Sequence, residues 1–304
     1  MSGFTDQDVP DQSGKCFLVT GSNTGLGFAA AAVLAARGGR VLMACRNEDK
    51  ARAAMARIRA ETPAADLAFL PLDQADLDSV RACADHALRE PRIDVLLNNA
   101  GVMFPPLQRT KQGHELQWGV NHLATFALTG LLLPKLAETA GSRVVTTASL
   151  AHRGGRIDWD DLDARRGYHR TQRYSASKLA NLLHAFELDR RLRAAGSPVT
   201  AVSCHPGLAR TDLSRHAGLF RVLFPLAGLL FNTAAQGAWP SLQAAAGPVE
   251  PGGYYGPQRF LEFAGPSGPA RRTAAARDPR FARRLWDVSV EMTGIDPGLP
   301  PIAG

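Results

Sequence analysis

TGSNTGLG, residues 20–27, lies between a short apolar run and an alanine-rich helical pattern. The run KCFLVT (Lys15–Thr20) is typical of a buried strand, and the helical pattern extends from Leu26 to Arg37. Glycines in such a turn let the backbone bend sharply and approach a pyrophosphate, which the free N–H groups of the helix N-terminus can bind. An ordinary tight turn is the alternative, but a turn directly after the first strand favours a nucleotide site. The glycines are Gly21, Gly25 and Gly27.

Strand and helix patterns alternate along the chain on both sides of this turn. The expected strands are Lys15–Thr20, Arg40–Cys45, Leu67–Leu72, Ile93–Asn98, Ser142–Ser149 and Pro198–Cys204. The expected helices are Leu26–Arg37, a helix capped by Asn47 that ends at Glu61, and segments near Leu77–Arg89, His114–Glu138 and Arg173–Ala195. Such alternation indicates βαβ units. The predicted fold is α/β: a Rossmann-like, doubly wound parallel sheet in a three-layer α/β/α single domain.

The two ends of the chain are expected to lie outside the main body of this domain. Residues 1–14 are interpreted as a flexible N-terminal tail, and residues 15–265 as the Rossmann-like catalytic domain. After Pro206 the pattern weakens, with a short strand expected at Gly252–Gly256 and a last helix near Pro279–Thr293. Residues 266–304 are therefore interpreted as a C-terminal extension.

The composition is that of an ordinary globular protein, because 45% of the residues are hydrophobic and 21% are charged. The net charge of +7 comes mainly from arginine and suits an anionic ligand. No dense basic helix or basic–aromatic alternation indicates nucleic-acid binding. The four cysteines show no pairing pattern, which favours a reducing, cytoplasmic location, and the eight histidines lack metal-ligand spacing, so no metal is expected.

No segment of the sequence predicts stable membrane insertion. The polar, acidic start of the chain is typical neither of a signal peptide nor of an anchor. The most apolar stretch, LFRVLFPLAGLLF (Leu219–Phe231), is shorter than the roughly 18 residues of a membrane span. Arg221 and Pro225 also interrupt it.

A tyrosine and a lysine lie four residues apart in RYSASKLAN (Arg173–Asn181), where a helix is expected. Tyr174 and Lys178 would share one helix face, and a cation beside a phenol favours the phenolate. Lowering the pKa of Tyr174 by about three units requires roughly 4 kcal/mol. Taken alone, the pair is typical of a solvated helix face. Its place after Ser149, at the end of an expected strand, favours general acid/base catalysis instead.

Together these motifs resemble the short-chain dehydrogenase/reductase family over about residues 15–260. The turn has the spacing TGxxxGxG, and five motifs follow in family order: NNAG (Asn98–Gly101), Asn121 in VNHLATF, Ser149, YSASK (Tyr174–Lys178) and PGLART (Pro206–Thr211). The long gap between Ser149 and Tyr174, with LPKL, SLAH and YYGP, resembles the retinol-dehydrogenase-like branch and its bacterial relatives. Membrane-bound members of that branch carry an N-terminal anchor, which is not expected here, so retinoid metabolism is not carried over.

The resemblance implies that the chain transfers a hydride between a nicotinamide cofactor and an alcohol or carbonyl substrate. It assigns catalytic roles to Asn121, Ser149, Tyr174 and Lys178. Tyr174 would exchange a proton with the reacting oxygen, and Ser149 would donate a hydrogen bond to that oxygen. Lys178 would also bind the nicotinamide ribose, and Asn121 would hold a water between Lys178 and solvent. On residue chemistry alone, Ser149 is equally a strand-end cap, and Asn121 a buried amide bonded to backbone.

Cofactor contacts are expected at the ends of the strands. Arg46 follows the second strand where a site for unphosphorylated ribose usually has an acid, which favours NADP(H) over NAD(H); a surface arginine is the alternative. By resemblance, Asp73 would meet the adenine amine, and the PGLART loop would hold the carboxamide through its backbone and Thr211. The expected contacts are Gly21, Asn23, Thr24, Gly25, Leu26, Gly27, Arg46, Asp73, Asn98, Ala100, Gly101, Tyr174, Lys178, Pro206, Gly207 and Thr211.

The substrate is expected to be a largely apolar small molecule. Residues 208–231 occupy the place of the family's substrate lid and include the apolar stretch Leu219–Phe231. Met103 and Phe104 would extend the same wall. A core helix or a subunit interface is the alternative for this stretch. The family often pairs through the helices that hold Asn121 and Tyr174, which makes a homodimer a family tendency.

Several features are assigned structural or surface roles. His152, His184 and His205 are interpreted as structural, the acids in Asp158–Asp163 as a solvated turn with caps, and the arginines in Arg271–Arg284 as surface charge. A function from another class, a nucleotide-sensing scaffold that binds a protein partner without turnover, would be favoured by loss of Tyr174 or Lys178. Both residues are present, which favours an enzyme.

Overall fold

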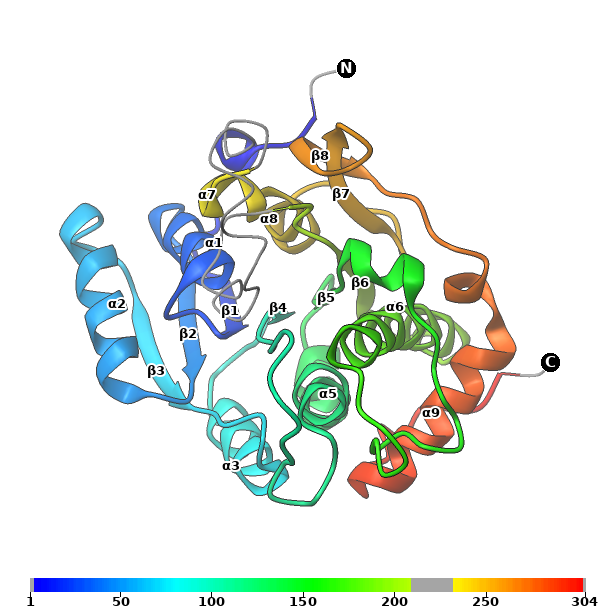
Figure 1. Ribbon diagram of the computed structural model, residues 1–304. Coiled ribbons are helices and arrows are strands. Elements are labelled where there is room, and N and C mark those ends of the chain that lie inside the picture. The colour runs from blue at the N-terminus through cyan, green and yellow to red at the C-terminus, as the bar shows by residue number, and fades with distance from the viewer. Residues whose placement is uncertain (1–2, 209–231, 303–304) are drawn as a thin grey trace.

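A computed structural model describes residues 3–208 and 232–302 of the chain. One eight-stranded sheet runs through it in the order β3-β2-β1-β4-β5-β6-β7-β8, with β1 to β7 parallel and β8 antiparallel (Figure 1). The strands are β1 (Cys16–Thr20), β2 (Arg40–Cys45), β3 (Leu67–Pro71), β4 (Val95–Asn98), β5 (Arg143–Thr147), β6 (Thr200–Cys204), β7 (Tyr254–Arg259) and β8 (Ala264–Pro269). The predicted Rossmann-like α/β fold is confirmed.

Helices cover both faces of the sheet. The α-helices are α1 (Gly25–Ala36), α2 (Glu48–Glu61), α3 (Leu77–Ala87), α4 (Leu116–Trp118), α5 (Ala124–Ala137), α6 (Arg170–Ala194), α7 (Ala234–Gly237), α8 (Trp239–Ala246) and α9 (Pro279–Thr293). A π-helical segment, η2 (Gly119–Leu123), joins α4 to α5, and short 3-10 helices are η1 (Asp6–Asp8), η3 (Leu150–Gly154) and η7 (Ala275–Arg277). Asn47 caps α2 as predicted, because its side chain accepts a hydrogen bond from Lys50 N.

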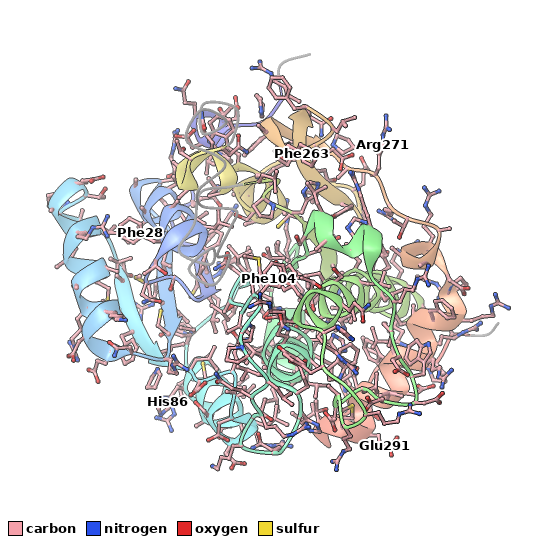
Figure 2. The ribbon with its side chains drawn as sticks, viewed as in Figure 1. Phe28, His86, Phe104, Phe263, Arg271 and Glu291 are labelled. Carbon is pink, nitrogen blue, oxygen red and sulfur yellow. The ribbon has the colours of Figure 1, made fainter. Side chains whose placement is uncertain are left out.

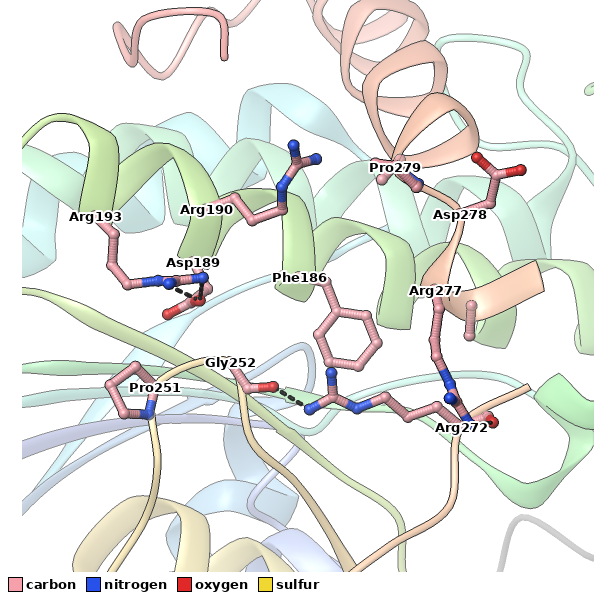
Figure 3. A pocket seen from close by; sticks show the side chains of 12 residues that line it. Phe186, Asp189, Arg190, Arg193, Pro251, Gly252, Arg272, Arg277, Asp278 and Pro279 are labelled. Atoms are coloured by element: carbon pink, nitrogen blue, oxygen red, sulfur yellow. Dashed lines mark hydrogen bonds and ion pairs between the residues drawn. The ribbon is translucent and has the colours of Figure 1, made fainter. Parts of the chain in front are cut away.

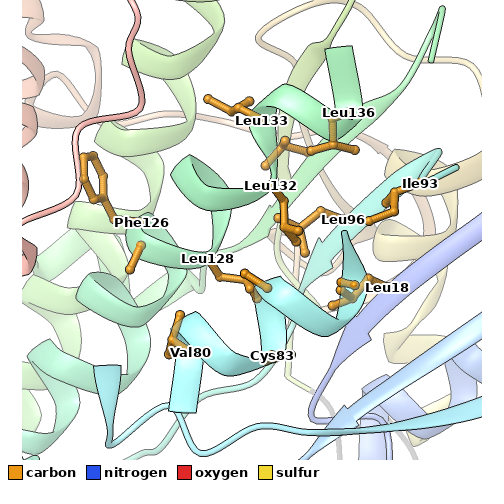
Figure 4. Close-up of a cluster of buried hydrophobic side chains, with 14 of the residues drawn as sticks. Leu18, Val80, Cys83, Ile93, Leu96, Phe126, Leu128, Leu132, Leu133 and Leu136 are labelled. Carbon is orange, nitrogen blue, oxygen red and sulfur yellow. The ribbon is translucent and has the colours of Figure 1, made fainter. Parts of the chain in front are cut away.

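Alternate residues of each strand pack against different helices, because successive side chains of a strand point to opposite faces. Leu18 belongs to a core that α3, α5 and α9 also enter (Figure 4). Its neighbours Phe17 and Val19 belong to a second core with α1, α2 and α8. Both cores are fully buried at β1, so the central strands hold the loops at their ends.

The strand order of the sheet reverses between β1 and β4: β2 and β3 lie on one side of β1, and β4 to β8 lie on the other. β1 pairs with β2 on one side and with β4 on the other, Leu18 lying opposite Leu96. In parallel sheets, ligands bind beyond the carboxyl ends of the strands at such a reversal. The loops after β1, β4, β5 and β6 all open at this position.

Residues 3–14, expected to be part of a flexible tail, pack against β8 and α8 in the structure. Phe4 exchanges two backbone hydrogen bonds of 2.8 Å with Ser267 of β8, and Trp239 Nε1 donates to Asp6 Oδ1 at 2.7 Å. Val9 is buried in the core of α1 and α8. This segment packs because it covers the otherwise open edge of β8, a long-range contact that its polar composition does not predict.

The expected boundary at residue 265 falls inside β8, and α9 packs into the main core. Trp286 of α9 contacts the rings of Phe126 and His184, with centroids 5.2 and 6.0 Å apart. The strand β8, with sequence AGPSGP, and the helices α7 and α8 were not predicted. Glycine and proline disfavour strands, and β8 forms through its pairing with β7.

The packing of α9 bears on the expected homodimer. α9 lies along α6 and reaches α5 (Figure 1). It therefore covers part of the helix face through which the resemblance implies pairing. Among the described helices, none combines the length and apolar character needed to cross a membrane.

Candidate active site

The turn after β1 has the geometry of a nucleotide cradle. Gly21 has a φ of +65°, and a Cβ atom there would lie 2.9 Å from the Cβ of Ala100 at the end of β4. A Cβ at Gly27 would collide with Asn99 Nδ2. α1 then begins at Gly25, and the side chain of its N-cap, Thr24, makes no capping hydrogen bond. The free N–H groups of α1 therefore face the turn, as binding of a pyrophosphate requires.

Two residues that were not predicted hold this turn against the end of β4. The Thr20 hydroxyl accepts hydrogen bonds of 3.0 Å from the backbone N–H groups of Asn99 and Ala100. Asn99 Nδ2 returns a bond of 2.9 Å to the Thr20 carbonyl. Asn98 instead points into the core, where Nδ2 donates to Thr129 Oγ1 at 3.1 Å. The motif NNAG contains Asn99. The sequence does not show that Asn99 joins the ends of β1 and β4.

Tyr174 and Lys178 lie one turn apart at the start of α6, as predicted, and both are buried. Lys178 Nζ donates to the Thr147 carbonyl at the end of β5 at 3.1 Å, and lies 5.9 Å from the centroid of the Tyr174 ring. Ser149 follows β5 and caps η3, since its Oγ accepts from Ala151 N at 3.2 Å. This bond uses the oxygen as acceptor, so the hydroxyl keeps a proton that it can donate.

The structure corrects the electrostatic argument made for Tyr174. Burial raises the pKa of Tyr174, and a hydrogen bond with Ser149 lowers it by less. Burial also lowers the pKa of Lys178 to about 8. The lowered Tyr174 pKa that the sequence predicts is therefore not produced by these residues alone, because removal from water outweighs the hydrogen bond with Ser149.

Asn121 lies in the π-helical segment η2, and its side chain bonds mainly to backbone. Oδ1 accepts from Val102 N at 2.8 Å, and Nδ2 donates to the Val102 carbonyl at 3.0 Å and to Ser177 Oγ at 2.9 Å. A Cβ atom at Gly101 would lie 3.0 Å from Asn121 Oδ1 and 3.5 Å from Lys178 Nζ. Asn121 thus holds the segment Gly101–Val102, which lies between it and Lys178. The water that Asn121 is expected to hold between Lys178 and solvent stays a prediction.

Phe104, near the centre of the view in Figure 2, forms an aromatic wall beside Tyr174, which is predicted to be catalytic. Its ring meets Tyr174 edge-on with 5.2 Å between centroids. The residue has a φ of +59°, a strained conformation for a bulky side chain. Phe104 N donates to Gln117 Oε1 at 3.0 Å, and Gln117 Nε2 donates to the Tyr168 hydroxyl at 3.1 Å. These two residues were not predicted, and they hold Phe104 in place.

Arg46 and Asp73 follow β2 and β3, on the side where the ribose and adenine are expected. Arg46 is exposed, and no residue in the described ranges bonds to its guanidinium. Asp73 Oδ1 accepts from Ala75 N at 2.9 Å. Cys45, which stands where an acid would bind unphosphorylated ribose, is buried, with Sγ 3.4 Å from Ser22 Oγ in the nucleotide turn. Asn23 and Leu26 lie in or beside that turn and are partly exposed.

The loop after β6 begins with Pro206 and Gly207. Gly207 has a φ of +68°, and its N–H donates to His205 Nδ1 at 3.2 Å. Leu208 N donates to the carbonyl of Phe263 in the β7–β8 turn at 2.9 Å. Thr211 and the rest of the expected lid, residues 209–231, lie outside the described residues.

A charged cluster ties this loop to the segment after Ser149. Glu262 Oε2 lies 2.7 Å from Arg153 Nη2 in η3 and 3.3 Å from the buried His205 Nε2. Glu262 has a φ of +72° and ends a run of left-handed residues with Phe260 and Leu261. The strained turn therefore brings one carboxylate to two segments of the candidate site.

Comparisons with known proteins agree with this geometry. Residues 15–219 match the family described as short chain dehydrogenase. The chain is 40% identical to retinol dehydrogenase 14 of Homo sapiens, over 93% of this chain and 87% of that protein. It is 42% identical to retinol dehydrogenase 13 of Homo sapiens, over 93% and 86%.

Solved structures give the same result. An uncharacterized protein from Mycobacterium paratuberculosis has a TM-score of 0.82 and 39% identity, covering 99% of this chain and 100% of that one. A short chain dehydrogenase from Burkholderia cenocepacia J2315, in complex with NADP, has a TM-score of 0.63 and 25% identity, over 80% of this chain and 96% of that one.

Proposed function

This chain belongs to the short-chain dehydrogenase/reductase family, and from that premise we propose that it interconverts an apolar alcohol and its aldehyde or ketone with NADP(H). Its general class is an NAD(P)-dependent oxidoreductase that acts on CH–OH groups. The observation that carries the proposal is that the buried Tyr174 and Lys178 lie with the half-buried Ser149 beyond the end of β5.

Each catalytic side chain has a distinct task in this proposal. The cofactor that these residues would hold would supply the hydride acceptor or donor and, when oxidised, a positive charge. Tyr174 holds the proton that passes to the substrate oxygen during reduction and takes it back during oxidation. The Ser149 hydroxyl donates a hydrogen bond to the same oxygen and orients it. Lys178, with a pKa of about 8, is mostly cationic at neutral pH and favours the phenolate.

The preference for NADP(H) rests on Arg46. Its exposed guanidinium follows β2, where it can form paired hydrogen bonds to a 2′-phosphate, and Cys45 stands where an acid would repel one. The proposed contacts of the cofactor otherwise remain those of the sequence prediction, from Gly21 to Thr211.

The preference for an apolar substrate rests on two features. The Phe104 ring lies against Tyr174, so one wall beside the proton donor is aromatic. The sequence Leu219–Phe231, which follows the loop after β6, is rich in leucine and phenylalanine. Apolar pockets are lined by such side chains, with few polar groups to fix orientation.

The proposal also concerns assembly and location. Because α9 covers part of the α5 and α6 face, we propose that the protein does not pair through these helices in the expected way. The four cysteines are all buried and free. Free thiols in this number suit a reducing compartment, which supports the proposal of a cytoplasmic protein.

The test is turnover of a panel of aldehydes, ketones and alcohols, followed by nicotinamide absorbance. Wild type should favour larger apolar substrates with NADPH, and Tyr174→Phe should lose at least about 100-fold in kcat, because only the proton donor is removed. NADPH affinity, measured by fluorescence titration, should change little in that variant. A Tyr174→Phe protein that keeps most of its kcat would contradict the mechanism.

A further inference from the structure

A pocket of about 440 Å³ lies near the start of β6, away from the carboxyl ends of the strands that form the candidate active site. Gly252, on its wall, donates to the Ala201 carbonyl near the start of β6 at 2.9 Å. The other walls come from the second half of α6 and from the residues around the start of α9 (Figure 3). The volume is typical of small-molecule sites. The pocket is therefore separate from the groups used in the proposed function.

Arg272 is held in a fixed position on the wall of this pocket. Its guanidinium stacks on the Phe186 ring, with 3.9 Å between Cζ and the ring centroid, and donates to the Gly252 carbonyl (Figure 3). The bond to Gly252 engages one of its three nitrogens, so further N–H donors remain. A guanidinium that is already positioned loses little side-chain freedom when it binds an oxyanion.

Arg277 brings a second positive charge beside Arg272. Its Nη2 donates to the Arg272 carbonyl at 2.9 Å. Burial, followed by the charge of Arg277, lowers the pKa of Arg272. Within residues 3–208 and 232–302, no carboxylate forms a salt bridge with either guanidinium. Two adjacent like charges without a paired acid repel each other, and an anion between them would relieve that repulsion.

The acids that line the pocket already have arginine partners. Asp189 is buried and pairs with Arg193 at 2.8 Å, and Asp278 caps α9 and pairs with Arg280 at 3.2 Å. The charge of Asp189 also acts on Arg272, but from beyond salt-bridge distance. Four guanidiniums and two carboxylates line the pocket, which leaves an excess of two positive charges: Arg190, Arg193, Arg272 and Arg277 against Asp189 and Asp278.

We propose that this pocket binds a phosphate-bearing anion whose phosphate oxygens lie between Arg272 and Arg277. A phosphate monoester is close to doubly charged at neutral pH and matches the excess charge, and its oxygens accept the paired N–H groups of arginine. The remaining wall includes Ala276 and Ala282, which are apolar and suit a small organic body on the phosphate. A free metabolite and a phospholipid headgroup present the same chemistry.

Titration calorimetry with inorganic phosphate tests the site. The protein is first saturated with NADPH so that the cofactor site is filled, and chloride of equal ionic strength serves as the blank. Wild type should show one saturable site, and Arg277→Gln should weaken it by about tenfold or more, since a charge-assisted hydrogen bond is lost. Arg277 is exposed, so this variant should fold even if Arg272→Gln does not.

Arg283→Gln is the matched control. It also removes one positive charge, but from a residue of α9 that does not line the pocket, so phosphate binding should be unchanged. Absence of saturable phosphate binding, or equal binding by Arg277→Gln and wild type, would overturn the proposal. Sedimentation with phosphatidylglycerol vesicles distinguishes the two sources: Arg277-dependent sedimentation indicates a lipid headgroup, and phosphate binding without sedimentation indicates a soluble ligand. Neither readout needs turnover, so failure here is distinct from failure of the proposed function.

Discussion

Tyr174 shows how burial changes the chemistry of a single residue. Its phenol is removed from water, which raises its pKa and keeps it protonated, while Lys178 lies close enough to act on the ring. The protein thus supplies a protonated acid held in place by Ser149 and Phe104. In the proposed reaction, the positive charge that lowers the pKa of Tyr174 arrives largely with the oxidised cofactor.

Arg46 gives the test of cofactor choice at this scale. Arg46→Ala should raise the KM for NADPH by about tenfold or more, because charge-assisted hydrogen bonds to the 2′-phosphate are lost. The KM for NADH should stay within about twofold. Arg52→Ala, which removes an exposed arginine paired with Glu48 on α2, is the control. Equal changes for both cofactors, measured by initial rates, would refute the role of Arg46.

At the scale of elements, the β7–β8 turn supports the candidate site through the side chain of Glu262. Glu262 reaches η3 through Arg153 and the end of β6 through His205. Its Oε1 accepts from Arg271 N at 3.0 Å, which holds the chain after β8. Residues in left-handed conformations persist only where surrounding contacts compensate for the strain. The turn therefore couples the Ser149 segment to the Pro206 loop.

Glu262→Gln should weaken this support without removing a catalytic group. Loss of the carboxylate leaves Arg153 without its ion-pair partner, so the free energy of unfolding should fall by roughly 1–3 kcal/mol. The KM for NADPH should rise more than kcat falls, since the Pro206 loop is expected to contact the cofactor. Denaturant unfolding and initial rates measure the two effects. Glu291→Gln, an exposed acid on α9, is the control, and identical behaviour of the two variants would contradict this role.

At the scale of the whole molecule, α9 closes the α5 and α6 side of the sheet over a pair of buried histidines. His184 lies between Phe126 and Trp286, and neither of its ring nitrogens has a partner among the described residues. His122 lies beside it and bonds Ser289 of α9 at 2.7 Å. Burial lowers the pKa of His184 to about 4 and places that of His122 well below its usual value. Both histidines are therefore neutral in the folded protein at neutral pH.

This burial predicts an acid-sensitive core. The unfolded chain binds a proton at His184 near pH 6.5, and the folded chain near pH 4. The contribution of His184 to the free energy of unfolding is therefore fully present above about pH 6.5. It falls by roughly 3 kcal/mol as the pH drops toward 4. His184→Phe should flatten the decline because it removes the titrating group and fills the same space. Equal losses of unfolding free energy in both proteins between pH 6.5 and 4.5 would exclude His184 as the cause.

Local chemistry is sufficient to predict the parts of this protein that depend on neighbouring residues in the chain. The glycine turn, the Asn47 cap and the spacing of Tyr174 and Lys178 follow from backbone freedom and helical periodicity. The alternation of apolar runs and helical patterns likewise predicts the parallel sheet, and with it the end of the strands where a cofactor is expected.

Contacts between distant segments decide the rest. The polar residues 3–14 become ordered only by covering β8, and AGPSGP forms a strand only because β7 lies beside it. Burial, which no single segment determines, raises the pKa of Tyr174 against the sequence prediction. The contacts of Arg272 with Phe186 and Gly252 likewise join three segments that are distant along the chain. Desolvation and long-range pairing depend on what surrounds a group in three dimensions, and the spacing of residues along the chain does not contain that information.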